Sequence, residues 1–218
     1  MAKKVLEVHA KAKKMCLKMM NTKPSNISFQ EGKVYGFKGH NGSGKTMLFR
    51  SICGLIIPTT GEVLIENKKI GKDISFPPSV GVLIEYPGFL PQHTGFKNLK
   101  MLASIKRQIE DEQIKNILEK VGLSFNDDRK FKKYSLGMKQ RLGLAQAIME
   151  DPDLIILDEP TNALDQEGIQ LVKNIVNELK SQSKTILIAS HDYEFLNDIT
   201  DEIFTLNDGC IVGHEIND

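Results

Sequence analysis

The sequence contains no apolar run that approaches the roughly 20 residues needed to span a bilayer. Its basic start, Met1-Ala2-Lys3-Lys4, leads into no apolar signal core. Cysteine is also scarce: Cys16, Cys53 and Cys210 are far apart and show neither a disulfide framework nor metal-ligand spacing, which favours a reducing compartment. We therefore expect a soluble, cytoplasmic protein that reaches a membrane only through a partner.

Charge of one sign is not in excess either. The 29 basic residues are balanced by 28 acidic ones, so the net charge is only +1 and we expect no nucleic-acid partner. Internal repeats and low-complexity tails are absent as well. With 218 residues, the chain suits one large α/β domain with room for a subdomain.

A phosphate-binding motif is present in full. The stretch Gly39-His40-Asn41-Gly42-Ser43-Gly44-Lys45-Thr46 matches the G-x-x-x-x-G-K-[ST] loop, or P-loop, at every fixed position. Its glycines let successive backbone N–H groups turn inward and form an anion-binding nest. Val34 to Phe37 is typical of a strand and Thr46 to Ile52 of a helix start, so the nest would lie at a helix N-terminus. We predict that Lys45 reaches the β- and γ-phosphates and that the Thr46 hydroxyl binds Mg²⁺.

Two further predicted strands end in polar side chains. The apolar run Leu154 to Leu157 is followed by Asp158 and Glu159, and the run Thr185 to Ala189 leads to His191. Such runs fit strands of a parallel sheet, whose carboxyl ends would share one crevice with the P-loop. We predict that Asp158 holds Mg²⁺ and that Glu159 activates water as a general base. The simpler interpretations are a strand-end carboxylate for Asp158 and a turn cap for Glu159.

Helical periodicity interrupts this strand-rich pattern between Gly95 and Glu150. Asp111 is predicted to cap the second helix of this block, and Gly122 to end it. Elsewhere we expect a turn at 67–69 and a terminal hairpin that turns at Asp208-Gly209. The two predicted apolar stripes of the helical block are Leu99, Leu102, Ile105 and Ile109, then Ile114, Ile117, Leu118 and Val121.

Three further segments resemble one family, the ATP-binding domains of ABC transporters. Tyr134 to Arg141 looks like the signature (LSGGQ-type) motif, Asp158 to Asp165 resembles the Walker B motif running into the D-loop, and His191 matches the switch histidine. The resemblance covers nearly the whole chain and implies one ABC ATPase domain over residues 1–218. Its fold would be a P-loop NTPase α/β core at 1–94 and 151–218, mostly parallel with an N-terminal antiparallel β region, and a helical signature subdomain inserted at 95–150.

The form of two motifs points to one branch of this family. Ser135-Leu136-Gly137-Met138, and the segment Gly81 to Phe89, are similar to ATP-binding subunits of bacitracin, lantibiotic and related drug exporters. Glu85 occupies the position where most ABC proteins have the Q-loop glutamine, whereas Gln92 lies too far into the loop. The resemblance thus places Glu85 with Thr46 and Asp158 as the predicted Mg²⁺ ligands.

The resemblance also implies a head-to-tail dimer of two such subunits, most simply two copies of this chain. ATP bound at one P-loop would be closed over by the partner's signature, and the open–close cycle would drive a transmembrane permease from the inner face of the cell membrane. Catalysis falls to Glu159, His191 and Lys45. The predicted ATP-binding residues are Gly39, His40, Asn41, Gly42, Ser43, Gly44, Lys45, Thr46, Met47, Ser135, Gly137, Met138 and Asp165.

Three features depart from the family pattern. No aromatic residue precedes Phe29, so nothing from Lys13 to Cys16 offers a ring for the adenine. Lys38 stands where an aliphatic residue is usual, and it must be either exposed or paired with a carboxylate. The motif needs no particular side chain at the position of His40, so we expect His40 to be a solvated loop residue.

Two other functions stay open on the sequence. One is a soluble ABC ATPase that acts as a regulatory or assembly switch without transport. The other is a nucleotide-binding switch with degenerate chemistry, which the missing adenine ring and Glu85 would suit. The presence of Lys45, Asp158, Glu159 and His191 argues against the second of these and favours an active ATPase.

Overall fold

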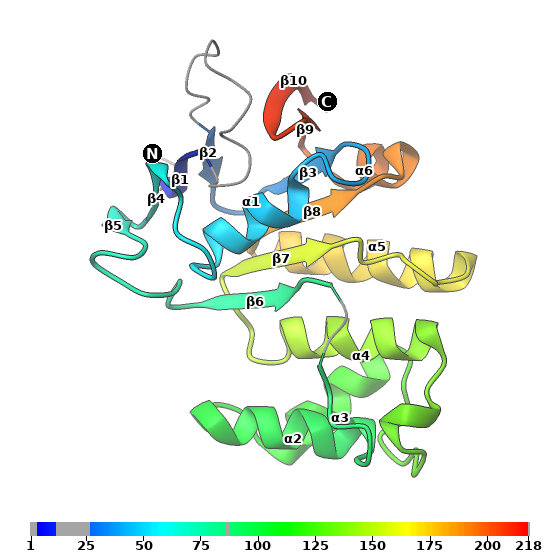
Figure 1. Ribbon diagram of the computed structural model, residues 1–218. Coiled ribbons are helices and arrows are strands. Elements are labelled where there is room, and N and C mark those ends of the chain that lie inside the picture. The colour runs from blue at the N-terminus through cyan, green and yellow to red at the C-terminus, as the bar shows by residue number, and fades with distance from the viewer. Residues whose placement is uncertain (1–3, 12–26, 86–87, 218) are drawn as a thin grey trace.

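The computed structural model describes residues 4–11, 27–85 and 88–217 (Figure 1). Its larger sheet has six strands in the order β10-β9-β3-β8-β7-β6. All neighbours in it are parallel except β10, which returns antiparallel beside β9, so the predicted mostly parallel α/β core is confirmed. The strands are β3 (Val34–Lys38), β6 (Val80–Leu83), β7 (Leu154–Asp158), β8 (Thr185–Ser190), β9 (Glu202–Asn207) and β10 (Cys210–Ile216).

The second sheet is antiparallel and has the order β2-β1-β4-β5, as expected for the N-terminal β region. Its strands are β1 (Lys4–Lys11), β2 (Ile27–Gln30), β4 (Thr60–Ile65) and β5 (Lys68–Lys69). The turn between β4 and β5 consists of Glu66 and Asn67, both with positive φ. The turn predicted at 67–69 was therefore wrong in position, because its two lysines pair with β4 as a short strand.

Helices cover both faces of the larger sheet. Helix α1 joins the two sheets through one apolar cluster, in which the rings of Phe37 and Phe49 lie 5.3 Å apart. The opposite face packs on α5 and α6, and α2–α4 form a block beside the edge strand β6 (Figure 1). The helices are α1 (Lys45–Ile52), α2 (Gly95–Lys106), α3 (Asp111–Lys120), a 3₁₀ turn (Phe131–Lys133), α4 (Leu136–Ile148), α5 (Gln166–Ser181) and α6 (Tyr193–Ile199).

The block of α2–α4 shares its core with the sheet rather than forming a separate one. Leu99 of α2, Leu118 of α3 and Leu142 of α4 are buried in the same cluster as Leu83 of β6. Helix α4 approaches β6 so closely that a Cβ on Gly81 would lie 1.7 Å from the Ala147 carbonyl oxygen. The structure thus seats α4 directly on the edge of the larger sheet.

Two predictions in the helical block were wrong. Helix α2 ends at Lys106, because Arg107 adopts a left-handed conformation, so Ile109 lies beyond the helix. Ile105 is within the helix but is 77% exposed, and the first apolar stripe therefore ends at Leu102.

The N-cap of the second helix lies one residue before the predicted one, so this prediction was wrong as well. Glu110 is the N-cap of α3, and its N–H donates to the Gln113 side chain at 2.7 Å, whereas Asp111 is the first helical residue. Gly122, with φ of 71°, follows the end of α3 as predicted. The hairpin turn at Asp208-Gly209 is confirmed too, since both residues have positive φ. None of the helices in the described part of the chain has the length and hydropathy of a bilayer span.

Candidate active site

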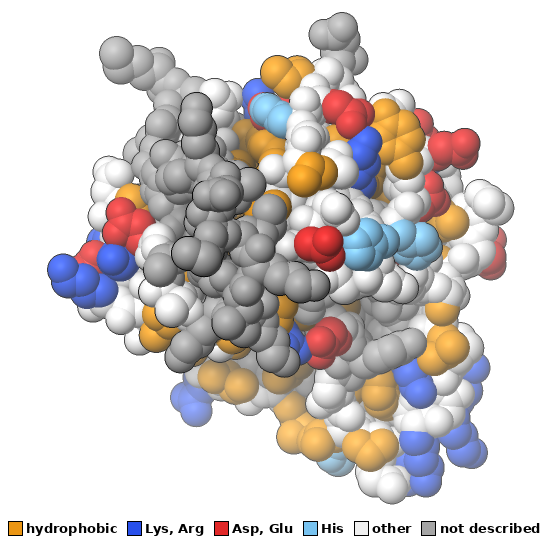
Figure 2. Space-filling model, turned by 45° about the horizontal axis from the view of Figure 1, so that its top comes forward, with side chains coloured by type: hydrophobic (Ala, Val, Ile, Leu, Met, Phe, Trp, Pro, Cys, Tyr) orange, Lys and Arg blue, Asp and Glu red, His pale blue; other side chains and the backbone are white. Residues whose placement is uncertain are grey.

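A cleft of about 350 Å³ opens where β3 and β7 end and α1 begins. This arrangement follows from the parallel sheet, because parallel strands present their carboxyl ends at one edge. Acidic and histidine side chains lie close together on the face shown in Figure 2. The residues that line the cleft are Asn41, Gly42, Ser43, Gly44, Lys45, Thr46, Met47, Glu85, Leu136, Gln140, Asp158, Glu159, Asn162 and Ala163.

The P-loop presents unpaired backbone donors to this cleft. Gly42 and Gly44 have φ values of 83° and 107°, conformations that glycine adopts without strain. The N–H groups of residues 44–47 have no backbone acceptor among the described residues, as expected for the first turn of a helix. The Lys45 ammonium folds back on the loop and donates to the Gly39 carbonyl at 2.7 Å. This set of donors fits an anion such as the phosphates of a nucleotide.

Two other details of the loop fit the same ligand. The Ser43 hydroxyl oxygen is buried and has no hydrogen-bond partner among the described residues, so a polar group is missing next to it. A Cβ on Gly39 would lie 2.5 Å from both the Ser43 hydroxyl oxygen and the Leu206 carbonyl oxygen. The loop therefore needs glycine at position 39 to keep its shape.

Asp158 and Thr46 meet on one side of the cleft. The Thr46 hydroxyl donates to Asp158 Oδ2 at 2.5 Å. Burial raises the pKa of Asp158, and the hydrogen bond from Thr46 opposes that rise. A hydroxyl and a carboxylate are oxygen donors that suit Mg²⁺, which usually takes few protein ligands and completes its shell with phosphates and water. No cluster of three or more His, Cys, Asp or Glu that could hold a metal occurs in the described ranges.

Glu159, which follows β7, and His191, which follows β8, are in direct contact. His191 Nδ1 lies 2.8 Å from Glu159 Oε2, although the two residues are 32 positions apart. The other carboxylate oxygen, Oε1, is buried and accepts no hydrogen bond from the described residues. The glutamate has φ of 50°, a conformation that a non-glycine residue rarely adopts. The sequence pattern did not indicate this contact, only that both residues follow neighbouring strands.

Gln140 is a site residue that the sequence reasoning missed. It lies on the signature helix α4, is 7% exposed and lines the cleft. Its side-chain amide donates to the Glu159 carbonyl oxygen at 2.9 Å, so it supports the backbone of the predicted base. The sequence signal that could have indicated it is a glutamine one helical turn after Leu136, within the signature segment.

Glu85 lines the cleft, but its carboxylate is engaged elsewhere. Oε1 accepts a hydrogen bond from Arg50 Nη2 at 2.7 Å, and Glu85 has φ of 57°. Arg50, on α1, is thus a second residue that the sequence reasoning missed. It balances the additional negative charge that Glu85 places beside the phosphate-binding loop.

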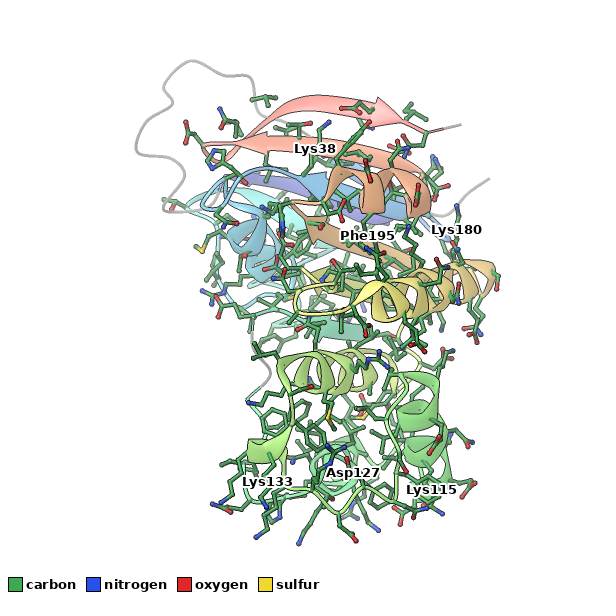
Figure 3. All side chains as sticks on the ribbon, turned by 90° about the vertical axis from the view of Figure 1, so that its right-hand side faces the viewer. Lys38, Lys115, Asp127, Lys133, Lys180 and Phe195 are labelled. Carbon is green, nitrogen blue, oxygen red and sulfur yellow. The ribbon has the colours of Figure 1, made fainter. Side chains whose placement is uncertain are left out.

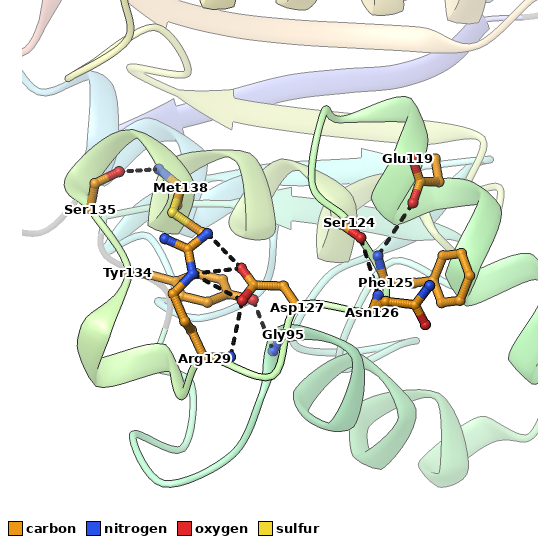
Figure 4. A network of polar contacts seen from close by, with 10 residues as sticks. All are labelled: Gly95, Glu119, Ser124, Phe125, Asn126, Asp127, Arg129, Tyr134, Ser135 and Met138. Atoms are coloured by element: carbon orange, nitrogen blue, oxygen red, sulfur yellow. Dashed lines mark hydrogen bonds and ion pairs between the residues drawn. The ribbon is translucent and has the colours of Figure 1, made fainter.

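The signature residues and Asp165 gather in a second hollow next to the cleft. Ser135 caps α4 by accepting a hydrogen bond from the Met138 N–H at 3.2 Å (Figure 4). Asp165 caps α5 in the same way through the Gly168 N–H at 2.8 Å. Gly137 lines the same hollow. None of these predicted ATP-binding residues lines the cleft of the same chain's P-loop, although their neighbours Leu136 and Ala163 line both hollows.

The segment before the signature is fixed by its own polar contacts (Figure 4). The Tyr134 hydroxyl accepts a hydrogen bond from the Gly95 N–H at 3.2 Å, and Asp127 binds Arg129 at 2.7 Å. The Arg129 side chain is 57% exposed although it is ion-paired.

The remaining predictions around the loop have mixed outcomes. Lys38 was expected to be either exposed or paired with a carboxylate, and in the structure it pairs with Glu215 at 2.5 Å. His40 is exposed, and its ring nitrogens contact the Asn41 carbonyl oxygen and the Asn207 side chain. The adenine region predicted at Lys13 to Cys16 lies outside the described residues.

Known proteins resemble the chain in sequence. The sequence model of the ABC transporter family matches residues 22–162. The ABC transporter ATP-binding protein YybJ of Bacillus subtilis (strain 168) is 47% identical over 84% of this chain and 85% of its own length. The bacitracin transport ATP-binding protein BcrA of Enterococcus faecalis is 39% identical over 88% of this chain, which spans 63% of BcrA. The lantibiotic transport ATP-binding protein SrtF of Streptococcus pyogenes is 36% identical over 86% of this chain and 80% of its own length.

A solved structure agrees with the fold. The dimeric structure of MJ0796, a bacterial ABC transporter cassette, superposes with a TM-score of 0.81 at 23% identity, covering 99% of this chain and 97% of that one. At this identity the structural similarity shows the fold alone, whereas the family model and the relatives show which family the chain belongs to. The chain therefore belongs to the ABC transporter family and is one of its ATP-binding, ATP-hydrolysing domains.

Proposed function

We propose that the chain powers a membrane exporter of a drug, a peptide antibiotic or a similar compound, as a peripheral subunit on the cytoplasmic face of the membrane. The observation that carries this proposal is the similarity, along most of the chain, to ATP-binding proteins of bacitracin and lantibiotic transport. The compound itself would contact the membrane partner, so this chain's own site carries the chemistry of ATP alone.

In the proposed mechanism the P-loop binds the phosphates of ATP. The N–H groups at the start of α1 donate to the phosphate oxygens, and Lys45 exchanges its bond with the Gly39 carbonyl for the β- and γ-phosphates. Thr46 and Asp158 would hold Mg²⁺, and Glu85, which lines the same cleft, would add the carboxylate oxygen that Arg50 does not bind. When bound, the metal ion would neutralise charge on the phosphates.

Glu159 and His191 would act on the attacking water. The free Oε1 of Glu159 accepts the proton of the water as it attacks the γ-phosphate, which is the task of a general base. His191 holds the other carboxylate oxygen in place through their 2.8 Å contact. Gln140 donates to the backbone carbonyl oxygen of the same residue, so the base is held at two points.

A second copy of the chain would complete the site. Ser135, Gly137, Met138 and Asp165 face a hollow separate from their own P-loop, which supports a head-to-tail dimer in which they approach the partner's ATP. The N-terminus of α4 would then direct its positive dipole end at the γ-phosphate.

An apolar groove on the helical block suits the membrane permease. It runs beside α2, and three of its lining residues, Leu90, Met101 and Ile105, are exposed by 45%, 42% and 77%. Exposed apolar side chains that gather on one surface are typical of interaction sites. The adjacent segment carries three lysines, Lys130, Lys132 and Lys133, and the Lys132 N–H donates to the Pro91 carbonyl. These lysines form no ion pair among the described residues.

The exporter role predicts a phenotype in the native host. Deleting the gene should raise sensitivity to at least one compound in a panel of bacitracin, lantibiotics and membrane-active drugs, and the wild-type gene should restore resistance. Lys45→Met should fail to restore it, because the purified variant should hydrolyse ATP at least about 100-fold more slowly. Growth inhibition curves and phosphate release measure the two effects.

Lys72→Met is the matched control, since Lys72 is an exposed lysine outside the cleft and should restore resistance fully. Unchanged sensitivity of the deletion strain across the whole panel would contradict the exporter role and favour a regulatory ABC ATPase. Restoration by Lys45→Met would contradict ATP-driven transport.

A further inference from the structure

Lys38, at the end of β3, closes a three-residue cluster with Tyr193 and Glu215. Its ammonium donates to Glu215 Oε1 at 2.5 Å and lies 4.4 Å from the centroid of the Tyr193 ring. The Tyr193 hydroxyl donates to the other carboxylate oxygen of Glu215 at 3.1 Å. Each member therefore contacts the other two, and each comes from a different element: β3, α6 and β10.

The cluster connects two segments of the active site, the P-loop and the turn that carries His191. Lys38 directly precedes Gly39 of the P-loop, and Tyr193 follows His191 by two residues. In the parallel register Lys38 pairs with Ser190, the last residue of β8, so the strand into the P-loop runs beside the strand into the His191 turn. In Figure 3 Lys38 lies next to the C-terminal hairpin, above Phe195 of α6.

The contacts within the cluster favour one geometry. A lone surface ion pair contributes little to stability, because water screens it and two long side chains must be ordered. Here the lysine is held by a carboxylate and an aromatic face together, and the carboxylate by a lysine and a hydroxyl. The bond from Lys38, and then that from Tyr193, holds the pKa of Glu215 below its usual range, so the carboxylate stays charged at neutral pH.

We propose that Lys38, Tyr193 and Glu215 are positioning residues for ATP hydrolysis: they brace the turn that carries His191 against the strand that carries the P-loop. This inference rests on the proposed roles of His191 and Glu159. The brace fixes Tyr193 at the start of α6, and thereby restricts the exposed His191 side chain to positions from which it contacts Glu159. The phosphate-binding donors at the start of α1 do not depend on it.

The matched reference for this brace is an ion pair at the other end of the same strand. Lys33, just before β3, binds Glu202 of β9 at 2.9 Å, and its side chain is 35% exposed against 26% for Lys38. Both pairs tie the strand to the C-terminal hairpin. Only the Lys38 cluster reaches the segment of His191, so only its loss should alter turnover.

The test compares Lys38→Met, Tyr193→Phe and Glu215→Gln with Lys33→Met in steady-state ATP hydrolysis. The three brace variants should lower kcat about three- to tenfold with the KM for ATP unchanged, since a misplaced catalytic group slows chemistry rather than binding. Lys33→Met should keep the wild-type kcat. Tyr193→Phe removes one exposed hydroxyl and should keep the fold, so the test stands even if another variant unfolds.

A second background separates positioning from general structure. In His191→Ala protein, adding Lys38→Met should change kcat no further, because the brace acts through the histidine. A further fall in that background, or brace variants with the kcat of wild type, would overturn the inference. If His191→Ala itself hydrolysed ATP normally, the proposed mechanism would fail instead.

Discussion

Glutamine in place of Glu159 should slow ATP hydrolysis by at least about 100-fold while ATP still binds. Glutamine has nearly the same shape and can still contact His191, but it cannot take a proton from water. The side chain is 17% exposed, and its Oε1 is buried without a partner among the described residues. Phosphate release reports the loss of turnover, and a fluorescent ATP analogue reports the retained binding.

The comparison for this variant is Glu112→Gln, which changes a glutamate on α3 whose side chain is 73% exposed and pairs with Lys115. It should turn over ATP at the wild-type rate. Normal turnover by the Glu159 variant would show that another group activates the water, and loss of ATP binding would show that the residue has a structural role.

Alanine in place of Gly81 should destabilise the protein by at least about 3 kcal/mol. A Cβ at this position would lie 1.7 Å from the Ala147 carbonyl oxygen and 2.7 Å from Pro152 Cγ, so β6 and α4 would have to separate. Neither neighbour is the end of a flexible side chain. Separation would expose Leu83 and Leu142, which belong to one buried cluster. Denaturant unfolding followed by circular dichroism measures the change.

Gly88→Ala is the control for this prediction, because an added Cβ there would meet nothing within 4 Å. It should unfold at the wild-type midpoint. A Gly81 variant as stable as the control would mean that the signature helix does not seat tightly on the sheet, and the link from α4 to Glu159 through Gln140 would lose its basis.

The sequence predicted those elements whose pattern is local. The apolar run of β7 is buried at every position, and β8 is buried as well, as the mainly apolar sequence of both runs implied. The P-loop lies between a strand and a helix because its glycines and the flanking apolar residues specify both. The hairpin at Asp208-Gly209 likewise depends on two residues that tolerate positive φ.

Elements that depend on distant partners were harder to predict. Ile105 continues the apolar period of α2, yet the residue is exposed in the structure. Arg50 and Glu85 are 35 positions apart, and no spacing rule joins them. The same holds for Gln140, whose partner is the backbone carbonyl of Glu159, directly after β7. Such contacts arise only when the sheet brings separate segments together.

In the proposed dimer, each ATP site is built from the P-loop of one copy and the signature segment of the other. Lys45→Met damages the first half of the site, and Gly137→Glu the second, so each variant alone should be inactive. In a mixed dimer one site would combine the intact P-loop of the Gly137 variant with the intact signature of the Lys45 variant.

The direct measurement is ATP hydrolysis by the two inactive variants before and after they are mixed in equal amounts. With random exchange, half of the dimers are mixed and each has one intact site of two, so activity should recover to about a quarter of the wild-type rate. A mixture as inactive as its components would contradict the shared site and place the whole of the chemistry within a single chain.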